Sequence, residues 1–481
     1  MQRAPWAALA RGTVATASGT QTTPFSKGKA VRTLRFFVVC SLVLTAVLLM
    51  RVANFASTEM PDPQAAAESS GEALCGGEPC GAVVRGALAF FDRRLRGLEA
   101  NGRACADCHM ATDHFQLSPA NVEARFQLLQ WRLGWNPNAD DPLFRPIDAD
   151  DFRTNGEHAS DFSNLRQNGL VRISFPLPQF IRLIDPATNT TSSETFVDVW
   201  RAVPSVNDVA LTGPDGTNPW ARGPNATGGY QLDARVATLQ EQALGALTNH
   251  AQIRHAPPQR LLDDLASFQR VLFTNERVRA LSEAVTAGAF PLPDPDPPLN
   301  TLEEQGKVVF QRACAHCHAG PGQSGGAPGL ALRYHDIGSQ CPRPVDTVTT
   351  PRWVFKPCPP SLARNARIYE ILLINGTTAR RASSDPGRAR LTGFVGGAAP
   401  TDDWNKFDVP GLRGIRHTAP YFHNNSAATL EEVVDHYIQF FNRVKALNAV
   451  PPPVATTNGT EFNRQPLPEE RAALLAYLRK L

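Results

Sequence analysis

The sequence contains the stretches Ala104-Cys105-Ala106-Asp107-Cys108-His109 and Ala313-Cys314-Ala315-His316-Cys317-His318. Each is a Cys-x-x-Cys-His motif, the attachment signature of c-type haem. The two thiols of such a motif bond to the two vinyl groups of one haem, and the histidine that follows turns under the ring and binds the iron. The sequence therefore predicts two covalently bound haems, held by Cys105, Cys108, His109, Cys314, Cys317 and His318, with His109 and His318 as the proximal iron ligands.

Similar helical patterns lead into both motifs. Gly86-x-x-x-Phe90 precedes the first and Gly306-x-x-x-Phe310 precedes the second, which indicates an internal repeat. A zinc site would pair two Cys-x-x-Cys knuckles much closer in sequence, and a thioredoxin-like dithiol would need no histidine. We therefore expect a mainly α fold of two cytochrome c-like helical lobes, each with one covalently bound haem, and long irregular loops.

Composition along the chain predicts the domain boundaries. We expect an export signal or membrane anchor in residues 1–56, a linker in 57–80, the first haem lobe in 81–290, a proline-rich linker in 291–300 and the second haem lobe in 301–481. The middle of the first lobe is rich in Gly, Pro, Asn and Asp, which favours loops with short helices. Residues 259–285 and 469–481 have helical periodicity, and Thr301-Leu-Glu-Glu304 is typical of a capping box that opens a helix.

The N-terminal segment has the pattern of an export signal. Its basic residues, with no acid before Glu59, precede an uncharged apolar run from Phe36 to Met50. The run is short for a membrane span, which favours a signal peptide, whereas the poor cleavage site after it favours a retained anchor. In both cases the rest of the chain crosses a membrane. We expect it in the periplasm of a Gram-negative bacterium, either free or anchored to the inner membrane.

Cysteine usage and charge agree with this compartment. Cys75 with Cys80, and Cys341 with Cys358, are local pairs that we expect to form disulfides outside the cytoplasm, with free thiols as the alternative. The net charge is only +3, so the sequence gives no indication of a nucleic-acid partner.

The ligand on the far side of each iron decides the chemistry. A haem with two strong protein ligands only passes electrons, whereas an open or weak sixth position binds peroxide or dioxygen. Methionine is the usual sixth ligand of electron carriers, yet no methionine follows Met110. The second haem therefore cannot have a His/Met pair from its own lobe. Met110 directly follows His109 and cannot easily reach the opposite face of the first haem.

Further landmarks lie along the chain. They are Gly86-Ala-Leu-Ala-Phe-Phe-Asp-Arg-Arg-Leu95, Val203-Pro204-Ser205-Val206, Asp233-Ala-Arg235, Leu239-Gln-Glu-Gln-Ala243, Phe407-Asp-Val-Pro-Gly-Leu-Arg-Gly-Ile-Arg-His-Thr-Ala-Pro-Tyr-Phe-His423 and Thr429-Leu-Glu-Glu-Val-Val-Asp-His-Tyr437. With these landmarks the sequence resembles the bacterial diheme cytochrome c peroxidase and MauG family, over most of residues 83–481.

The resemblance implies a sixth ligand for the second haem. Tyr437 falls where peroxidases place a methionine ligand and where MauG-type members place a tyrosine. His436 is the rival, because histidine is the commoner iron ligand. The two lie about 100° apart on a predicted helix, so only one is expected to face the iron. A helix that merely packs, with neither residue bound, is the third possibility.

The resemblance also implies that the first haem is the reactive one, and here the sequence departs from the family. The tryptophan between the haems is replaced by Leu232, and the distal glutamate falls near Gln252. Gln242 keeps the family's distal glutamine, and His250 is a candidate to face the same pocket. An asparagine of an inter-haem calcium site falls at Ala202, although Thr418 and Pro420 are retained. His114 either caps the first haem or faces solvent.

These observations predict an exported diheme oxidoreductase of the peroxidase/MauG type. A small electron-donor protein, a cytochrome c or a cupredoxin, would reduce the second haem, and the first would activate hydrogen peroxide or another oxidant. Gln242, His250 and Gln252 are the catalytic candidates, and calcium is a further cofactor that the resemblance implies. Two alternatives stay open: a plain diheme electron-transfer cytochrome, and a diheme oxygenase that acts on an organic substrate.

Overall fold

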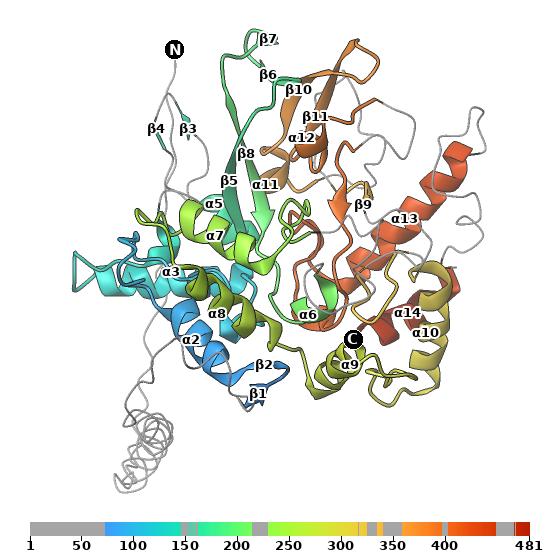
Figure 1. Ribbon diagram of the computed structural model, residues 1–481. Helices are drawn as coiled ribbons and strands as arrows, with labels where there is room; N and C mark the ends of the chain where they lie inside the picture. The colour runs from blue at the N-terminus through green and yellow to red at the C-terminus, as the bar shows by residue number, and fades with distance from the viewer. Residues whose placement is uncertain are drawn as a thin grey trace, which may run out of the picture. The chain divides into compact units, whose positions relative to one another are not determined.

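The structure is a computed structural model, shown in Figure 1. It describes residues 73–145, 153–154, 157–158, 162–213, 229–315, 317–324, 334–339, 358–396, 403–448, 466 and 468–481. Residues 72–481 form one compact unit. The predicted export segment, most of the predicted linker, Trp220, His316 and Cys341 lie outside the described residues.

Helices predominate in the described residues, and short strands lie between them (Figure 1). The α-helices are α2 (Cys80–Phe91), α3 (Pro119–Leu133), α5 (Ser163–Asn168), α6 (Val209–Thr212), α7 (Leu239–Asn249), α8 (Gln259–Arg270), α9 (Glu276–Thr286), α10 (Thr301–Ala313), α11 (Pro360–Ala363), α12 (Ala389–Thr392), α13 (Leu430–Asn448) and α14 (Arg471–Leu478). The strands are β1 (Leu74–Cys75), β2 (Glu78–Pro79), β3 (Arg153–Thr154), β4 (Glu157–His158), β5 (Leu170–Pro176), β6 (Ile181–Asp185), β7 (Thr190–Thr191), β8 (Phe196–Ala202), β9 (Tyr334–His335), β10 (Arg367–Leu372), β11 (Thr378–Ser383) and β12 (Phe407–Asp408).

The repeat that the sequence predicts is a pair of crossed helices in each lobe. α2 packs on α8 in the first lobe, and α10 packs on α14 in the second. A Cβ atom on Gly86 would lie 1.9 Å from the carbonyl oxygen of Asp264, and one on Gly306 would lie 1.9 Å from that of Ala473. Only glycine lets two backbones approach this closely, which explains why it recurs in both lead-in helices.

Each helix pair is surrounded by its own hydrophobic core. In the first lobe Phe90 packs edge-to-face on Phe268 at 5.3 Å between ring centroids. In the second lobe Phe310 meets Tyr477 at 5.4 Å. The aromatic residue four positions after each glycine thus has the same partner position in both lobes.

A sheet joins the two lobes, which the sequence did not lead us to expect. The strand order is β11-β10-β6-β7, so first-lobe strands β6 and β7 pair with second-lobe strands β10 and β11. Figure 1 shows the green and orange strands side by side. The prediction of loops with short helices in the middle of the first lobe is therefore wrong for residues 170–202. The mainly α prediction is confirmed only as the predominance of helices.

Several local predictions need small corrections. Asn300, not Thr301, caps α10, with Glu303 completing the capping box. The helical stretch 259–285 is two helices, because Asn275 caps a new one at α9. Cys75 and Cys80 form the predicted disulfide, and Cys358 is also disulfide-bonded.

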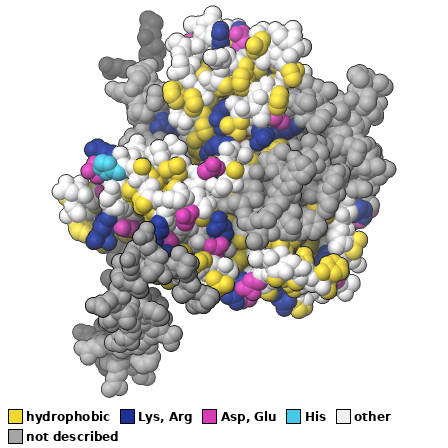
Figure 2. Space-filling model, viewed as in Figure 1, with side chains coloured by type: hydrophobic (Ala, Val, Ile, Leu, Met, Phe, Trp, Pro, Cys, Tyr) yellow, Lys and Arg dark blue, Asp and Glu magenta, His cyan; other side chains and the backbone are white. Residues whose placement is uncertain are grey.

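The tryptophans of the described residues differ in their exposure. Trp131 and Trp135 are exposed on α3, where their rings contact each other edge-to-face at 5.8 Å. Trp200 is buried against Leu170 and Leu362. On the face that Figure 2 shows, basic and acidic side chains are interspersed over the described surface.

Candidate haem sites

The proximal histidines have matching environments. Nδ1 of His109 donates to the carbonyl oxygen of Phe115 at 3.0 Å, and Nδ1 of His318 donates to that of Gln323 at 3.0 Å. Burial lowers the pKa of both imidazoles, which favours their neutral forms. Metal-binding histidines are commonly oriented by such a bond to a backbone carbonyl. With Nδ1 so engaged, Nε2 is the nitrogen that would bind a haem iron, and the backbone carbonyls of Pro204 and Pro410 also lie near the two rings.

The cysteines of the two motifs also have similar environments. None of Cys105, Cys108, Cys314 and Cys317 forms a disulfide. Burial raises the pKa of the Cys105 and Cys314 thiols to about 12, so both stay protonated at neutral pH. The amide of each motif histidine donates to the carbonyl of the motif's first cysteine at 2.9 Å. Two unbridged thiols and a histidine in one tight turn fit covalent haem attachment.

A cavity of about 880 Å³ reaches both motifs, with His109, His318, Cys314 and Cys317 in its lining. Most of its wall is carbon, from residues such as Val206, Leu239, Phe407 and Leu474. Arg381, Lys406 and Arg413 also line it, and such positive charges would suit the carboxylates that a haem carries. The described residues thus fit the haem groups that the two motifs imply.

The structure separates the two candidate ligands on α13. Tyr437 lines the cavity, and its pKa is raised by burial and by the nearby Cys317 and Cys314 thiols. His436 is buried on another side of the helix, where Nε2 bonds to the carbonyl of Ile337 at 2.7 Å. Tyr437 therefore lies toward the second attachment site. The imidazole of His436 instead forms a hydrogen bond with a backbone carbonyl.

The three catalytic candidates of the first site lie in different settings. Gln242, on α7, lines the cavity. His250 ends α7 and lies near enough to His109 that its charge lowers the pKa of that ring. Gln252 is exposed in a left-handed conformation and is absent from the cavity lining. The structure thus brings Gln242 and His250 toward the first site and leaves Gln252 outside it.

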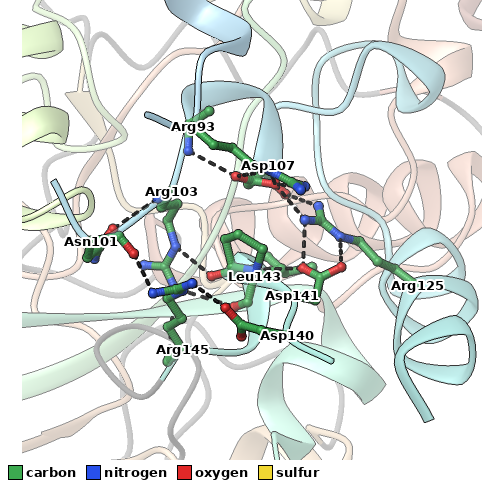
Figure 3. A network of polar contacts seen from close by, with 11 residues as sticks. Arg93, Asn101, Arg103, Asp107, Arg125, Asp140, Asp141, Leu143 and Arg145 are labelled. Carbon is green, nitrogen blue, oxygen red and sulfur yellow. Dashed lines mark hydrogen bonds and ion pairs between the residues drawn. The ribbon is translucent and has the colours of Figure 1, made fainter. Parts of the chain in front are cut away.

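A polar network holds the first attachment loop (Figure 3). The buried Asp107 carboxylate accepts from Arg93 at 2.6 Å, from Arg125 at 2.5 Å and from the amide of Ala104 at 2.9 Å. Burial by itself raises the pKa of Asp107, but these three donors prevail and lower it. Arg125 also pairs with Asp141 at 2.6 Å. The network fastens the loop between the two cysteines to α3 and to the chain beyond it.

The same region holds the turn that carries His250. The carbonyl of His250 accepts from Asn101 Nδ2 at 2.9 Å and from Arg103 Nη1 at 3.3 Å. Arg103 is buried and also donates to the carbonyl of Pro142 at 3.0 Å. Asn101 and Arg103 directly precede the first motif, so one segment positions both His109 and the end of α7.

A curated protein and several solved structures are similar to this chain. No family model matches the chain. A curated relative, cytochrome-c peroxidase IdrP2 of Denitromonas iodatirespirans, is 29% identical over 143 residues. The predicted resemblance is confirmed. The match spans 29% of this chain and 32% of the relative, so the chain matches about a third of that relative's length.

Two solved structures are similar over most of the chain. A MauG-like protein associated with microbial copper homeostasis has 17% identity and a TM-score of 0.40, covering 88% of this chain and 95% of that one. The diheme peroxidase BthA from Burkholderia thailandensis E264 has 17% identity and a TM-score of 0.38, covering 88% and 89%. These distant likenesses carry no assignment of function.

The peroxidase landmark Asp233-Ala-Arg235 has a structural explanation. Asp233 is fully buried and bonds to Arg201 at 2.7 Å, to Arg390 at 2.9 Å and to Arg235 at 2.7 Å. Arg201 also pairs with the buried Asp385 at 2.6 Å. Because Arg201 lies in the first lobe and Asp385 and Arg390 lie in the second, this network is part of the lobe junction.

The calcium ion implied by peroxidase resemblance does not fit the residues present. Ala202 has no side-chain oxygen to offer, and its amide donates to the carbonyl of His423 at 2.7 Å. Within the described residues, no three His, Cys, Asp or Glu side chains are grouped to hold a metal ion. We therefore assign no role to calcium.

Sequence reasoning missed two buried residues in the cavity lining. His423 stacks on Phe407 at 3.9 Å and bonds through Nδ1 to Ser339 at 3.1 Å, and its buried Nε2 has no hydrogen-bond partner among the described residues. Asp208 accepts from the amide of Thr274 at 2.9 Å, and burial raises its pKa to about 6. His423 was noted only as part of a landmark, and no sequence pattern marked Asp208.

No helix in the described parts of the chain is both long and apolar enough to cross a bilayer.

Proposed function

We propose that this protein is an exported diheme c-type oxidoreductase that reduces peroxide. Hydrogen peroxide would take up two electrons and two protons and leave as two water molecules. The electrons would come from a small donor protein, a cytochrome c or a cupredoxin, and pass through the second haem to the first. When bound, the haem irons supply the electron transfer and the cleavage of the peroxide bond.

The observation that carries the proposal is a shared cavity with different residues near its two attachment motifs. Near the second motif, Tyr437 lies toward the cysteines, which suits a haem with two protein ligands. Near the first motif, Gln242 lines the cavity and His250 lies close to His109. An amide neither titrates nor binds iron strongly, which suits a site that admits a small oxidant.

The chain also offers groups that hold and move protons. Gln242 donates and accepts hydrogen bonds but cannot carry a proton to peroxide. His250 carries an imidazole, a side chain that can donate a proton, and Asp208 has a pKa of about 6. We assign His250 as the proton donor of the first site, because it ends the helix that positions Gln242.

The first test is the visible spectrum of the ferric protein before and after one equivalent of hydrogen peroxide. A fast change in the haem bands supports the proposal. An unchanged spectrum with two low-spin irons would point to a plain electron carrier. A stable dioxygen complex together with no peroxide turnover would point to an oxygenase.

The ligand assignment has a matched pair of variants on one helix. Tyr437→Phe removes the phenol that lies toward the second motif, so one haem should change its spectrum. His436→Ala removes a hydrogen bond to Ile337 and should leave both haem spectra as in wild type. If only His436→Ala alters a haem, the assignment of Tyr437 is wrong.

A further inference from the structure

The segment after the first motif is tied to His109. Phe115 accepts the Nδ1 hydrogen bond of His109 at 3.0 Å. Its neighbour Gln116 is fixed through its backbone, because its carbonyl accepts from Met110 at 3.1 Å and its amide donates to Asp113 at 3.0 Å. A displacement of residues 115 and 116 would therefore turn the imidazole of His109.

The side chains of this segment reach into the second lobe. Gln116 is buried, and its Nε2 donates to the carbonyls of Ala419 at 3.0 Å and His417 at 3.3 Å. The ring of His114 stacks on the ring of His417 with 4.3 Å between centroids. Residues that follow the proximal ligand of one site thus bond directly to the other lobe.

The second-lobe partner segment continues to the second haem site. The amide of Gly414 donates to the carbonyl of Leu481 at 2.7 Å, and the hydroxyl of Tyr421 donates to Ile415 at 3.1 Å. The ring of Phe422 lies 6.4 Å from that of Tyr437. Contacts therefore run without a break from His109, through Gln116 and residues 417–422, to Tyr437.

Within the described part of the second lobe, the side chain at the equivalent position makes no such hydrogen bond. Its residue equivalent to Gln116 is Ser324, which follows the Gln323 carbonyl that accepts from His318. Ser324 is buried, but its hydroxyl has no hydrogen-bond partner among the described residues. The link through Gln116 is thus particular to the first site and is not required by the repeated fold.

We propose that Gln116 is a positioning residue that transmits the state of the second haem site to His109, through direct hydrogen bonds between the lobes and without a metal ion. The proposal rests on the proposed function, because it needs iron at both sites. The amide of Gln116 holds residues 417–419 at the place where the family resemblance implied a bridging calcium ion. A continuous path of contacts does not by itself show that the second haem site and His109 are coupled, so the coupling must be measured.

The test uses the full-length protein with both haems attached. Haem content is counted first, and the low-spin and high-spin signals of the ferric first haem are then recorded with the second haem oxidised and reduced. In wild type, reduction of the second haem should shift the signal of the first. Gln116→Ala should lose at least half of that shift while it keeps two haems per chain. Ser324→Ala, the matched control, should keep the full shift.

Further variants test the absence of a cation. Gln116→Glu puts a carboxylate against two carbonyl oxygens, and this repulsion should abolish the shift in the presence of a chelator. Millimolar calcium should restore the shift in Gln116→Glu and leave wild type unchanged. A wild-type shift that disappears with chelator would overturn the metal-free link.

The outcomes separate this inference from the proposed function. A protein that reacts with peroxide but shows the same shift in wild type and Gln116→Ala would refute the role of Gln116 alone. Equal losses in Gln116→Ala and Ser324→Ala would show a general effect of packing and refute it too. A wild-type protein without two haems or without a peroxide response would refute the proposed function instead.

Discussion

At the first site residues 92–104 lie between α2 and Cys105, whereas α10 runs directly into Cys314. Both sites nevertheless end in the same turn, with matching bonds from the motif histidine to the backbone. The crossing of the two helices and the position of the motif histidine are therefore the same in both lobes. The connecting segment was free to vary, and at the first site it carries the polar network and the support for His250.

The two sites differ most in the parts that the attachment of a haem would leave free to vary. Attachment of a haem constrains the two thiols, the histidine and the helix that leads to them. The surrounding helices and loops are not so constrained, and Gln242 and His250 lie near one site whereas Tyr437 lies near the other. Variants of the shared parts should therefore destabilise the two lobes equally. Variants of the differing parts should follow the charges that we assign.

The largest effect is expected at the two helix crossings. Gly86→Ala and Gly306→Ala would each place a Cβ atom 1.9 Å from a backbone oxygen. Because backbone must move to relieve this, each should cost about 3 kcal/mol or more of unfolding free energy, or prevent folding. Denaturant unfolding, or the yield of folded protein, measures it.

Gly245→Ala is the control for these variants. Gly245 lies in α7 with no atom within 4 Å of an added Cβ, so alanine should stabilise the helix by about 0.5–1 kcal/mol. Unequal losses in Gly86→Ala and Gly306→Ala would contradict the equivalence of the two crossings.

The next effect concerns the junction that both lobes share. Asp233→Asn leaves Arg201, Arg235 and Arg390 with one buried carboxylate fewer. The loss of one partner from such a network typically costs about 3–5 kcal/mol. Both haem bands should report one common unfolding transition at a lower denaturant concentration.

A surface pair serves as the comparison for Asp233. Glu123 and Arg166 are both partly exposed, at 39% and 31% of their side chains, so Glu123→Gln should leave the unfolding midpoint unchanged. Separate transitions of the two haems in Asp233→Asn would mean that the junction couples the lobes less than its burial suggests.

A smaller, pH-dependent effect is expected at the first attachment loop. The pKa of Asp107 is lowered in the folded state, so its charge stabilises the protein above about pH 4 and this contribution is lost as the pH falls. Asp107→Asn should cost about 1–3 kcal/mol at neutral pH. The difference from wild type should shrink at lower pH, as urea unfolding at several pH values would show. A pH-independent difference would contradict the assigned charge.

Asp208 should have the opposite pH dependence. Burial raises its pKa to about 6, so its contribution is favourable at low pH and is lost as the pH rises through about 6. The unfolding free energy of Asp208→Asn, measured relative to that of wild type, should therefore be about 1 kcal/mol higher at pH 8 than at pH 5. Unfolding curves at these two pH values measure the gain, and a relative loss at the higher pH would show that Asp208 is stabilised as an anion.

Sequence periodicity succeeded where contacts are local and failed where partners are distant. The α10 capping box was recognised, though one residue late, because Asn300 and Glu303 interact within one turn. Strands β5 and β8 were missed because most of their residues are buried on both faces, which removes the alternation that reveals a strand. Strand β6 was missed because its partner β10 lies far along the chain.

The candidate site divides in the same way. Two thiols and a histidine within five residues can be recognised from the sequence, because one covalent group requires that spacing. For two neighbouring residues on α13, no spacing in the sequence shows which one faces the second site. The packing of the helix decides that His436 bonds to Ile337 while Tyr437 lines the cavity. Gln252 was placed by counting along the chain, but the turn after α7 leaves it exposed.

From the sequence alone we could recognise the two Cys-x-x-Cys-His motifs, the repeated helix before each and the resemblance to diheme peroxidases, and predict the motif histidines as iron ligands. Only the tertiary structure decided the sheet between the lobes, the Asp107 and Asp233 networks, the cavity lining and the contact of Gln116 with the second lobe. Local covalent geometry imposes a short spacing that a reader can recognise. Contacts between residues hundreds of positions apart depend on how whole elements pack, and no short pattern encodes them.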